Sequence, residues 1–334
     1  MKLYAIADLH LGHEFNRAAL GELRPHPGDG LILCGDVGET DEHLELAFGA
    51  ATRNFGAVWW CPGNHELYTT GGGAPGGPRQ LRGEARYAHC VAVARRFGVR
   101  TPEDPYAVWE GEGGPALVAP LFTLYDYSFR PAHVARADAL RWAEDADTVA
   151  SDEFLLHPDP HPSREAWCRL LVQRAEARLA DARKPRKRAA LAAATAAGAE
   201  PRDDAGQPAA EGEREKEEEE EVVLPLVLAN HWPLREDLVY IPRVPRFSLW
   251  CGTKATEDWH RRFGAAVVVS GHLHVPRTDW RDGTRFEECS LGYPRQWREV
   301  HERGLDINDL LREILPGPPP PPGGNTTVRW RRWG

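Results

Sequence analysis

Five short polar clusters, each following an apolar stretch, carry the side chains of this sequence that could do chemistry. The clusters are Asp8-x-His10, Gly35-Asp36, Gly63-Asn64-His65-Glu66, Asn230-His231 and Gly271-His272-x-His274. They offer carboxylate, amide and imidazole groups, which hold divalent ions such as Mn, Fe or Zn in proteins. The six cysteines are scattered without any Cys-x-x-Cys pair, which argues against a thiolate zinc site. The clusters therefore predict a metal site built from oxygen and imidazole ligands.

The spacing within the clusters favours shared ligation. In an extended segment, residues two positions apart face the same side, so the Asp8–His10 pair can approach one ion together. The His272–His274 pair has the same spacing. Glycines beside the clusters allow sharp backbone turns and leave room for an ion or a substrate, at Gly35, Gly63 and Gly271.

The elements that must position these clusters alternate between apolar strands and amphipathic helices. The predicted strands are Leu3–Ala7, Leu31–Cys34, Ala57–Trp60, Ala116–Phe122, Val222–Ala229 and Ala265–Ser270. The predicted helices are Asp41–Asn54 with Thr40 as N-cap, Arg82–Phe97 and Glu257–Phe263, and Tyr68–Pro78 is expected to be a Gly-rich loop. This alternation predicts a layered α/β fold, in which the carboxyl ends of the strands converge on one crevice.

The chain of 334 residues is expected to contain one large domain, at 1–315. A low-complexity insertion at about 183–221 has almost no long apolar side chains, so burial cannot offset its chain entropy, and we expect disorder there. The tail at 316–334 contains the run Pro318–Pro322, and we expect it to be disordered as well.

Charge and hydropathy exclude several classes of protein. The net charge is −9, and eight glutamates lie in 211–221, so the rest of the chain lacks the broad basic field of a dedicated nucleic-acid binder. The longest apolar runs are only strand-sized, which predicts no association with a membrane. The N-terminus meets Asp8 too early for the core of a signal peptide, so we expect a cytoplasmic protein with reduced thiols.

Taken in series, the five clusters resemble those of the calcineurin-like metallophosphoesterases. The resemblance implies a fold of two β-sheets packed as a sandwich and flanked by helices, in four layers. It also implies a pair of divalent ions, with Mn, Fe or Zn as the candidates. The implied roles are one ion on Asp8, His10 and His274, a second on Asn64, His231 and His272, Asp36 as the bridge, and His65 as the group that contacts the phosphate and protonates the leaving oxygen.

The implied activity is hydrolysis of a phosphomonoester or phosphodiester in a small phosphorylated substrate, by a hydroxide that bridges the two ions. Two alternatives stay open: a nuclease of the DNA-repair type, disfavoured by the missing basic field, and a non-catalytic scaffold, disfavoured by the intact ligand set. The protein phosphatases of the family carry Asp-Arg-Gly after the Gly-Asp pair, whereas this chain has Val37-Gly38-Glu39-Thr40. That subclass is therefore disfavoured, and no protein partner is predicted.

Several further residues have two interpretations. Tyr125, Asp126 and Arg130 resemble a run that lines the substrate pocket in some family members, although a packed loop is the alternative. For Glu39 we favour a role at the start of the Asp41–Asn54 helix over one in the metal site. Glu66 is expected to support its loop rather than to bind metal. Of the implied ligands, His231 has the flanking residues that agree least with the family pattern. Its neighbour Trp232 is expected either to line the site or to pack in the core.

Overall fold

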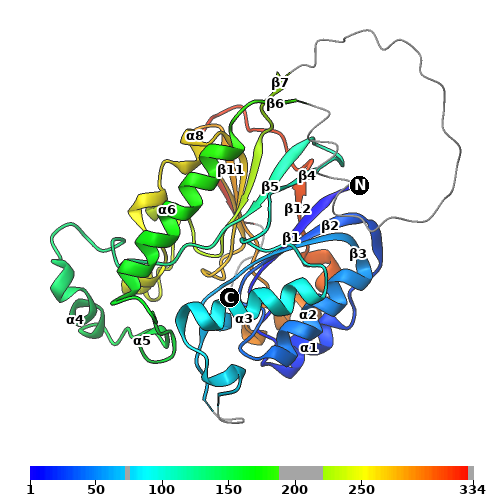
Figure 1. Cartoon of the computed structure of the whole chain (residues 1–334). Coiled ribbons are helices and arrows are strands. Elements are labelled where there is room, and N and C mark those ends of the chain that lie inside the picture. Colours follow the sequence, from blue (N-terminus) through cyan, green and yellow to red (C-terminus); the bar gives the residue numbers. More distant parts are fainter. Residues whose placement is uncertain (72–75, 188–220, 330–334) are drawn as a thin grey trace, which may run out of the picture.

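The apolar strands of this chain form two β-sheets that pack face to face, with helices on their outer faces (Figure 1). The computed structural model describes residues 1–71, 76–187 and 221–329. This arrangement confirms the predicted α/β sandwich. Among the described residues, no helix combines the length and the apolar character that crossing a bilayer requires.

The first sheet has four strands in the order β12-β1-β2-β3. Its strands are β1 (Leu3–Ile6), β2 (His26–Cys34), β3 (Phe55–Cys61) and β12 (Arg312–Leu315). The second sheet has seven strands in the order β13-β10-β11-β9-β8-β5-β4. They are β4 (Ala107–Trp109), β5 (Ala116–Pro120), β8 (Leu226–Ala229), β9 (Ala265–Ser270), β10 (Arg277–Arg281), β11 (Thr284–Glu288) and β13 (Thr326–Arg329).

The helices of the described chain lie on the outer faces of the two sheets or to one side of them (Figure 1). They are α1 (Glu14–Leu20), α2 (Asp41–Asn54), α3 (Gly83–Arg96), α4 (Ala139–Glu144), α5 (Asp152–Leu155), α6 (Arg164–Ala182), α8 (Trp259–Arg262) and α9 (Pro294–Glu302). In Figure 1, α1, α2 and α3 lie along the four-stranded sheet, and α6 and α8 lie along the seven-stranded sheet. Short 3-10 helices complete the set: η1 (His65–Leu67), η2 (Pro78–Gln80), η3 (Arg136–Asp138), η4 (Glu236–Leu238), η5 (Pro245–Trp250), η6 (Lys254–Thr256) and η7 (Ile307–Leu310).

Alternate residues along each strand serve different layers, because successive side chains of a strand point to opposite faces. One apolar cluster fills the space between the sheets, with members such as Ala5, Ile32, Trp59, Val118, Val227 and Val267. Their neighbours in sequence pack with the helices in another cluster, with members such as Ile6, Leu33, Trp60, Leu44 and Phe48. A strand that is buried on both faces has apolar residues at successive positions, and this continuous apolar pattern allowed these strands to be predicted from the sequence.

The predicted elements agree with the structure where their local signals are strong. The helix Asp41–Asn54 and the strand Ala265–Ser270 have the bounds expected from the sequence. The strand expected at 222–229 is instead two short strands, β7 (Glu221–Val222), paired with β6 (Arg186–Lys187), and then β8. Pro225 lies between them and has no N–H to donate to a ladder.

Other elements gave no recognised signal. The long helix α6 buries Trp167, Leu171 and Leu179, but charged residues separate these apolar positions. The tail was expected to be disordered throughout, whereas residues 326–329 form β13, which pairs antiparallel with β10 at the edge of the large sheet. Of the predicted insertion, residues 188–220 lie outside the described part of the chain.

The two sheets meet where their strands end. Ala7, the residue after β1, forms a parallel bridge with Ser290, which follows β11. The backbone N–H of Ala7 donates to Cys289 O at 3.1 Å, and that of Leu291 donates to Ala7 O at 2.8 Å. The carboxyl ends of parallel strands from both sheets therefore open onto one region of the molecule.

The N-cap of α2 gives a stability prediction. The side chain of Thr40 accepts a hydrogen bond from the backbone N–H of His43 at 3.4 Å. Thr40→Ala removes this acceptor and is expected to lower the free energy of unfolding by about 1 kcal/mol in urea titration. Thr52→Ala in the same helix is the control, because its hydroxyl donates to Phe48 O, which is not a terminal group. A change at Thr52 as large as that at Thr40 would contradict the capping role.

Candidate metal centre

Three predicted ligands from the two sheets meet at the ends of β1 and β9. The ligand atoms of Asp8, His10 and His274 all lie within 4.8 Å of one another. His274 Nε2 is 2.9 Å from Asp8 Oδ1 and 3.1 Å from His10 Nε2. All three side chains are buried. Residues separated by more than 260 positions in sequence therefore form one compact donor group.

A second group shares the same region. The ligand atoms of Asp36, His231 and His272 lie within 4.8 Å of one another, and His231 Nε2 is 3.5 Å from Asp36 Oδ2. Asn64 is brought beside them by the loop after β3, because the backbone N–H of His65 donates to Asp36 Oδ1 at 2.9 Å. Asp36 is also 4.0 Å from His10 Nε2, so it adjoins both groups.

Unpaired polar atoms test whether these residues fit a metal ion. Of the buried side-chain atoms without a hydrogen-bond partner in the described part of the chain, three belong to the predicted ligands: Asn64 Oδ1, His231 Nε2 and His272 Nε2. The other polar ends of two of these side chains are anchored. Asn64 Nδ2 donates to Asp152 Oδ1 at 3.0 Å, and His231 Nδ1 lies 2.9 Å from Cys34 O. Buried polar atoms without a partner are uncommon and call for an explanation, and lone pairs oriented toward a cation provide one.

The protonation states of His272 and Asp36 fit metal ligation. Burial, together with the neighbouring His231, lowers the pKa of His272 to about 3. The imidazole of His272 is therefore neutral at physiological pH, which is the form that binds a metal ion. Burial alone would raise the pKa of Asp36, but the adjacent His231 and His65 hold it well below its ordinary value. Asp36 is thus a carboxylate, as a bridging ligand must be.

The backbone at the clusters is not extended, which corrects the reasoning from spacing. Five of the predicted ligands have positive φ: Asp8 (55°), His10 (43°), Asp36 (52°), His272 (71°) and His274 (54°). A left-handed residue other than glycine costs about 1–2 kcal/mol. Such strain gathers at functional sites, where the surrounding structure holds it in place. The paired residues reach one site through tight turns rather than through a shared strand face.

The glycines beside the clusters have the predicted role. A Cβ at Gly63 would lie 2.2 Å from Asp36 Oδ1, and one at Gly271 would lie 2.3 Å from Asp8 Oδ2. Gly35 has φ of 84°, and a Cβ there would lie 2.5 Å from His231 Nδ1. No larger residue fits these positions without moving a ligand.

Glu66 holds two of the loops together, as expected from the sequence. Its fully buried carboxylate accepts backbone N–H groups from Asp36 at 3.1 Å, Val37 at 2.7 Å and Gly63 at 2.9 Å. Burial and the nearby charge of Asp36 raise the pKa of Glu66 to about 7. The side chain thus fixes the loops after β2 and β3 relative to each other.

His65 lies at the open side of the ligand groups. Its Nε2 is 3.8 Å from Asp36 Oδ2, and its Nδ1 is 2.9 Å from Glu39 Oε1. Burial would lower the pKa of His65, but the charges of Asp36 and Glu39 outweigh it and raise the pKa to about 9. Glu39 does directly precede the cap of α2, as the sequence indicated. The contact of Glu39 with His65 was not expected, because the two residues are 26 positions apart in the sequence and no local pattern links them.

Other supporting residues carry no motif in the sequence. Ser290 Oγ donates to Asp8 Oδ2 at 2.7 Å, and Gln296 Oε1 lies 2.7 Å from His274 Nδ1. Asp152, which holds the Asn64 amide, also accepts from the hydroxyl of Tyr68 at 2.6 Å. Each contact joins residues far apart in the chain, so no local pattern could have revealed it.

Aromatic rings line the ligand groups. Tyr293 stacks on His10 with a centroid distance of 4.3 Å, and Phe247 stacks on His272 at 5.6 Å. Trp232 is fully buried against both His231, at 5.2 Å, and His272, at 6.1 Å. Both roles considered for Trp232 are thus met, because it is a core residue that also backs two ligands.

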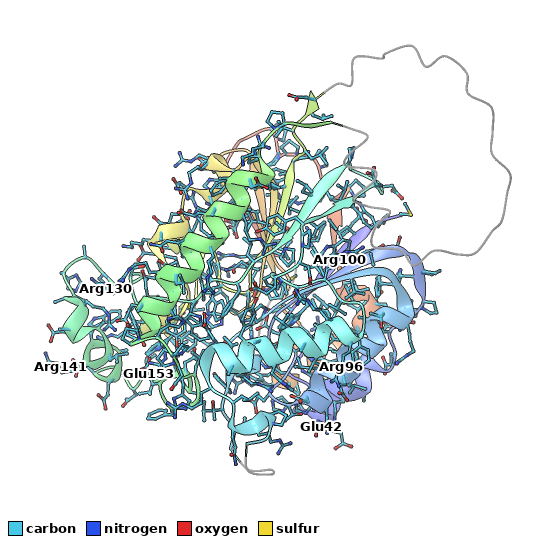
Figure 2. All side chains as sticks on the ribbon, viewed as in Figure 1. Glu42, Arg96, Arg100, Arg130, Arg141 and Glu153 are labelled. Atoms are coloured by element: carbon cyan, nitrogen blue, oxygen red, sulfur yellow. The ribbon has the colours of Figure 1, made fainter. Side chains whose placement is uncertain are left out.

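The three residues predicted to line the substrate pocket have packing contacts. Tyr125 is fully buried with its ring 6.4 Å from that of Trp232. Asp126 accepts from the hydroxyl of Thr253 at 2.8 Å, and Arg130 donates to Val134 O and Tyr127 O. Figure 2 shows Arg130 near Arg141 and Glu153, on the side of the molecule that carries α4 and α5. A role in substrate binding stays a prediction for all three.

Comparisons with known proteins agree with this geometry. A family model described as calcineurin-like phosphoesterase matches residues 1–176. The acyl-carrier-protein phosphodiesterase PptH of Mycobacterium tuberculosis is 40% identical over 318 residues, covering 95% of this chain and 84% of the relative. A crystal structure of the phosphopantetheinyl hydrolase PptH from Mycobacterium tuberculosis matches with a TM-score of 0.76 and 40% identity, over 96% of this chain and 98% of that one. The chain therefore belongs to the calcineurin-like phosphoesterase family and is a metal-dependent hydrolase of phosphate esters.

Proposed function

We propose that this hydrolase cleaves a phosphodiester with two divalent ions at the strand ends. The observation that carries the proposal is the position of Asp36, whose Oδ2 lies 3.5 Å from His231 Nε2 and 4.0 Å from His10 Nε2. A carboxylate between two ligand groups is suited to bridge a pair of ions. The proposed ligands are Asp8, His10 and His274 for one ion, Asn64, His231 and His272 for the other, and Asp36 for both. Mn, Fe or Zn suit such donors.

The residues around the ligands divide the remaining work. When bound, a pair of such ions supplies an activated water near neutral pH and neutralises the oxygens of the phosphate. The Glu39 carboxylate holds Nδ1 of His65 at 2.9 Å, so that Nε2 faces the ligand groups. From there, His65 donates a proton to the leaving ester oxygen, which otherwise departs as a costly alkoxide.

The proposed substrate is the phosphodiester that joins a phosphopantetheine group to a serine of an acyl-carrier protein. The descriptions of the similar protein PptH support it, since PptH is called both an acyl-carrier-protein phosphodiesterase and a phosphopantetheinyl hydrolase. Water would add to phosphorus while the serine oxygen leaves with a proton, giving unmodified carrier protein and free phosphopantetheine. No observation favours the nuclease alternative, and the complete donor set argues against a scaffold. A cytoplasmic location stays a prediction, and the six cysteines, all buried and free, support it.

Hydrolysis of a carrier protein tests the proposed function directly. The purified protein, loaded with Mn, is expected to release phosphopantetheine from a holo-acyl-carrier protein, detected as the loss of the prosthetic group by mass spectrometry. Asp36→Asn is the control, since an amide lacks the charge to bridge two cations, and release is expected to fall by at least about 100-fold. Turnover of bis(p-nitrophenyl) phosphate without any release from the carrier would refute the proposed substrate.

The role of His65 gives a second prediction. His65→Ala is expected to lower kcat by about 10²–10⁴-fold, because the leaving oxygen loses its proton donor. Metal content, measured by elemental analysis, is expected to match that of the unmodified protein, since His65 is not among the proposed ligands. Loss of metal in this variant would instead make His65 a ligand.

The close approach at Gly63 gives a third prediction. Gly63→Ala adds a methyl group whose carbon would lie only 2.2 Å from Asp36 Oδ1. Because the carboxylate must move, metal affinity is expected to fall by about 10–100-fold, as for other changes that reorient a ligand. Gly323→Ala is a matched control, since nothing lies within 4 Å of its Cβ position. Equal metal content in the two variants would contradict the role of Asp36.

A further inference from the structure

The segment 239–247 is fixed to the edge of the metal centre. Its last residue, Phe247, stacks on His272 at a centroid distance of 5.6 Å and an interplanar angle of 28°. The next residue anchors it from the other side, because Ser248 Oγ donates to Phe129 O at 2.8 Å. The segment also packs against Leu273, which lies between two of the proposed ligands. A protein whose ester enters the metal centre therefore meets this segment at the edge of the site.

Two large apolar side chains of this segment face solvent. Tyr240 is 45% exposed and Val244 is 48% exposed. Prolines at positions 242 and 245 restrict the backbone between and beside them, so the exposed side chains are held in place at little entropic cost. Tyr240 and Val244 thus offer apolar contact area on the segment that borders the metal centre.

The segment is also basic. It holds two arginines, Arg243 and Arg246, and no acidic residue, in a chain whose net charge is −9. A third arginine joins it from β13, since the guanidinium of Arg329 lies 4.4 Å from the centre of the Tyr240 ring. Arg243 and Arg329 are both exposed. The rim thus combines apolar contact area with positive charge.

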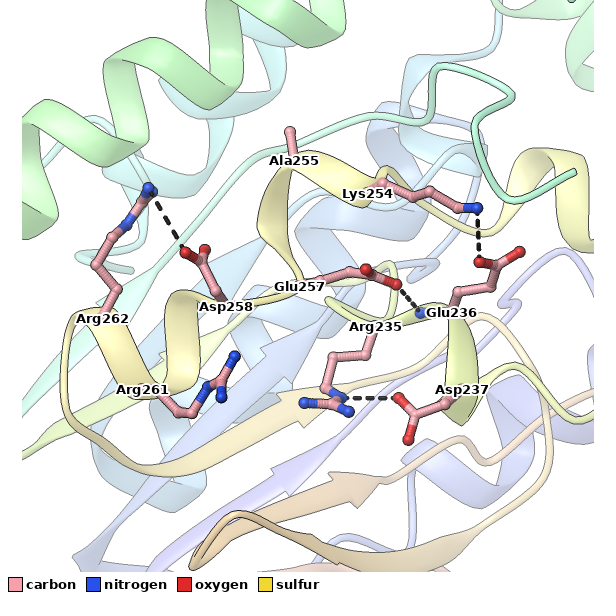
Figure 3. Close-up of a pocket in the computed structure, with 9 residues that line it drawn as sticks. All are labelled: Arg235, Glu236, Asp237, Lys254, Ala255, Glu257, Asp258, Arg261 and Arg262. Carbon is pink, nitrogen blue, oxygen red and sulfur yellow. Dashed lines mark hydrogen bonds and ion pairs between the residues drawn. The ribbon is translucent and has the colours of Figure 1, made fainter. Parts of the chain in front are cut away.

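A nearby pocket provides a contrast. It has a volume of about 560 Å³ and is lined by four basic and four acidic residues and an alanine (Figure 3). Its charges are paired within the pocket, for example Lys254 with Glu236 at 2.9 Å and Arg235 with Asp237 at 2.7 Å. The lining of this pocket has no net charge, whereas the 239–247 segment holds two arginines and no acidic residue.

We propose that segment 239–247, together with Arg329, is the docking surface for the carrier protein, and that it recognises acidic side chains around the modified serine. The proposal rests on the proposed function. The ester to be cleaved joins the arm directly to the serine, so cleavage requires the protein surface around that serine to press against the rim of the site. The proposed ligands are at most 9% exposed, so the carrier contacts the rim and not the ligands.

Charge reversal at the rim tests the docking surface. Arg243→Glu is expected to raise KM for a holo-acyl-carrier protein by about tenfold with little change in kcat, because a charge at an interface rim acts mainly on encounter and affinity. Turnover of bis(p-nitrophenyl) phosphate, which does not reach the rim, is expected to stay within about twofold. The difference in KM between the unmodified enzyme and the Arg243→Glu variant is expected to shrink as NaCl is raised from about 0.05 to about 0.5 M, since salt screens exposed charges.

Two further variants keep the test sharp. Val244→Asp, which changes both the apolar contact and the charge, is expected to raise KM for the carrier as well. Arg53→Glu is the control, because Arg53 is exposed in the last turn of α2, far in the chain from the segment, and its KM is expected to be unchanged. Melting temperatures of all variants report whether the fold is kept.

The outcomes separate the two proposals. Failure of the unmodified enzyme to cleave the carrier refutes the substrate and the docking surface together. Cleavage by the unmodified enzyme with an unchanged KM in both rim variants refutes the docking surface alone. An equal loss of turnover on the carrier protein and on bis(p-nitrophenyl) phosphate in the rim variants also refutes the docking surface, because the segment would then shape the metal centre rather than bind the carrier.

Discussion

The buried carboxylate of Asp36 is the constraint on which this structure depends. Its Oδ2 lies 3.5 Å from His231 Nε2 and 4.0 Å from His10 Nε2, so it adjoins side chains that follow strands of both sheets. Glu66 binds the backbone of the loops on both sides of it, and Gly63 leaves the space it occupies. Burial and the like charge of Asp36 raise the pKa of Glu66 to about 7, and the backbone N–H of Val37 partly opposes this rise.

The sandwich supplies the stability that this site lacks. Strained backbone at five ligands and buried atoms without partners are both unfavourable. The apolar layer between the sheets and the layers under the helices provide the offsetting burial, and they continue to the last residues of β1, β2, β3 and β8. The rigid part of the fold thus ends where the strained loops begin, and this is how a fixed arrangement of donors is maintained.

Sequence reasoning reached the side chains that the structure brings together because each follows a strand with a strong apolar signal. Asp8, Asp36 and His272 could be placed from the position of a strand end alone. Glu39, Ser290 and Gln296 could not, since their contacts depend on tertiary packing across the chain. Helix α6 was missed for a related reason: its apolar stripe is diluted by exposed charges, and only its burial against the sheet reveals it. The left-handed backbone at the clusters also had no signal, because aspartate and histidine tolerate several conformations.

The order of the ligands along the chain has a consequence for biosynthesis. The first donors are at residues 8 and 10, but His272 and His274 come near the end, and the glutamine that orients His274 is at position 296. A ribosome has therefore translated most of the message before either donor group is complete. Premature termination upstream of residue 272 would yield a product that lacks two of the proposed ligands, so the proposed centre can assemble only on a nearly full-length chain.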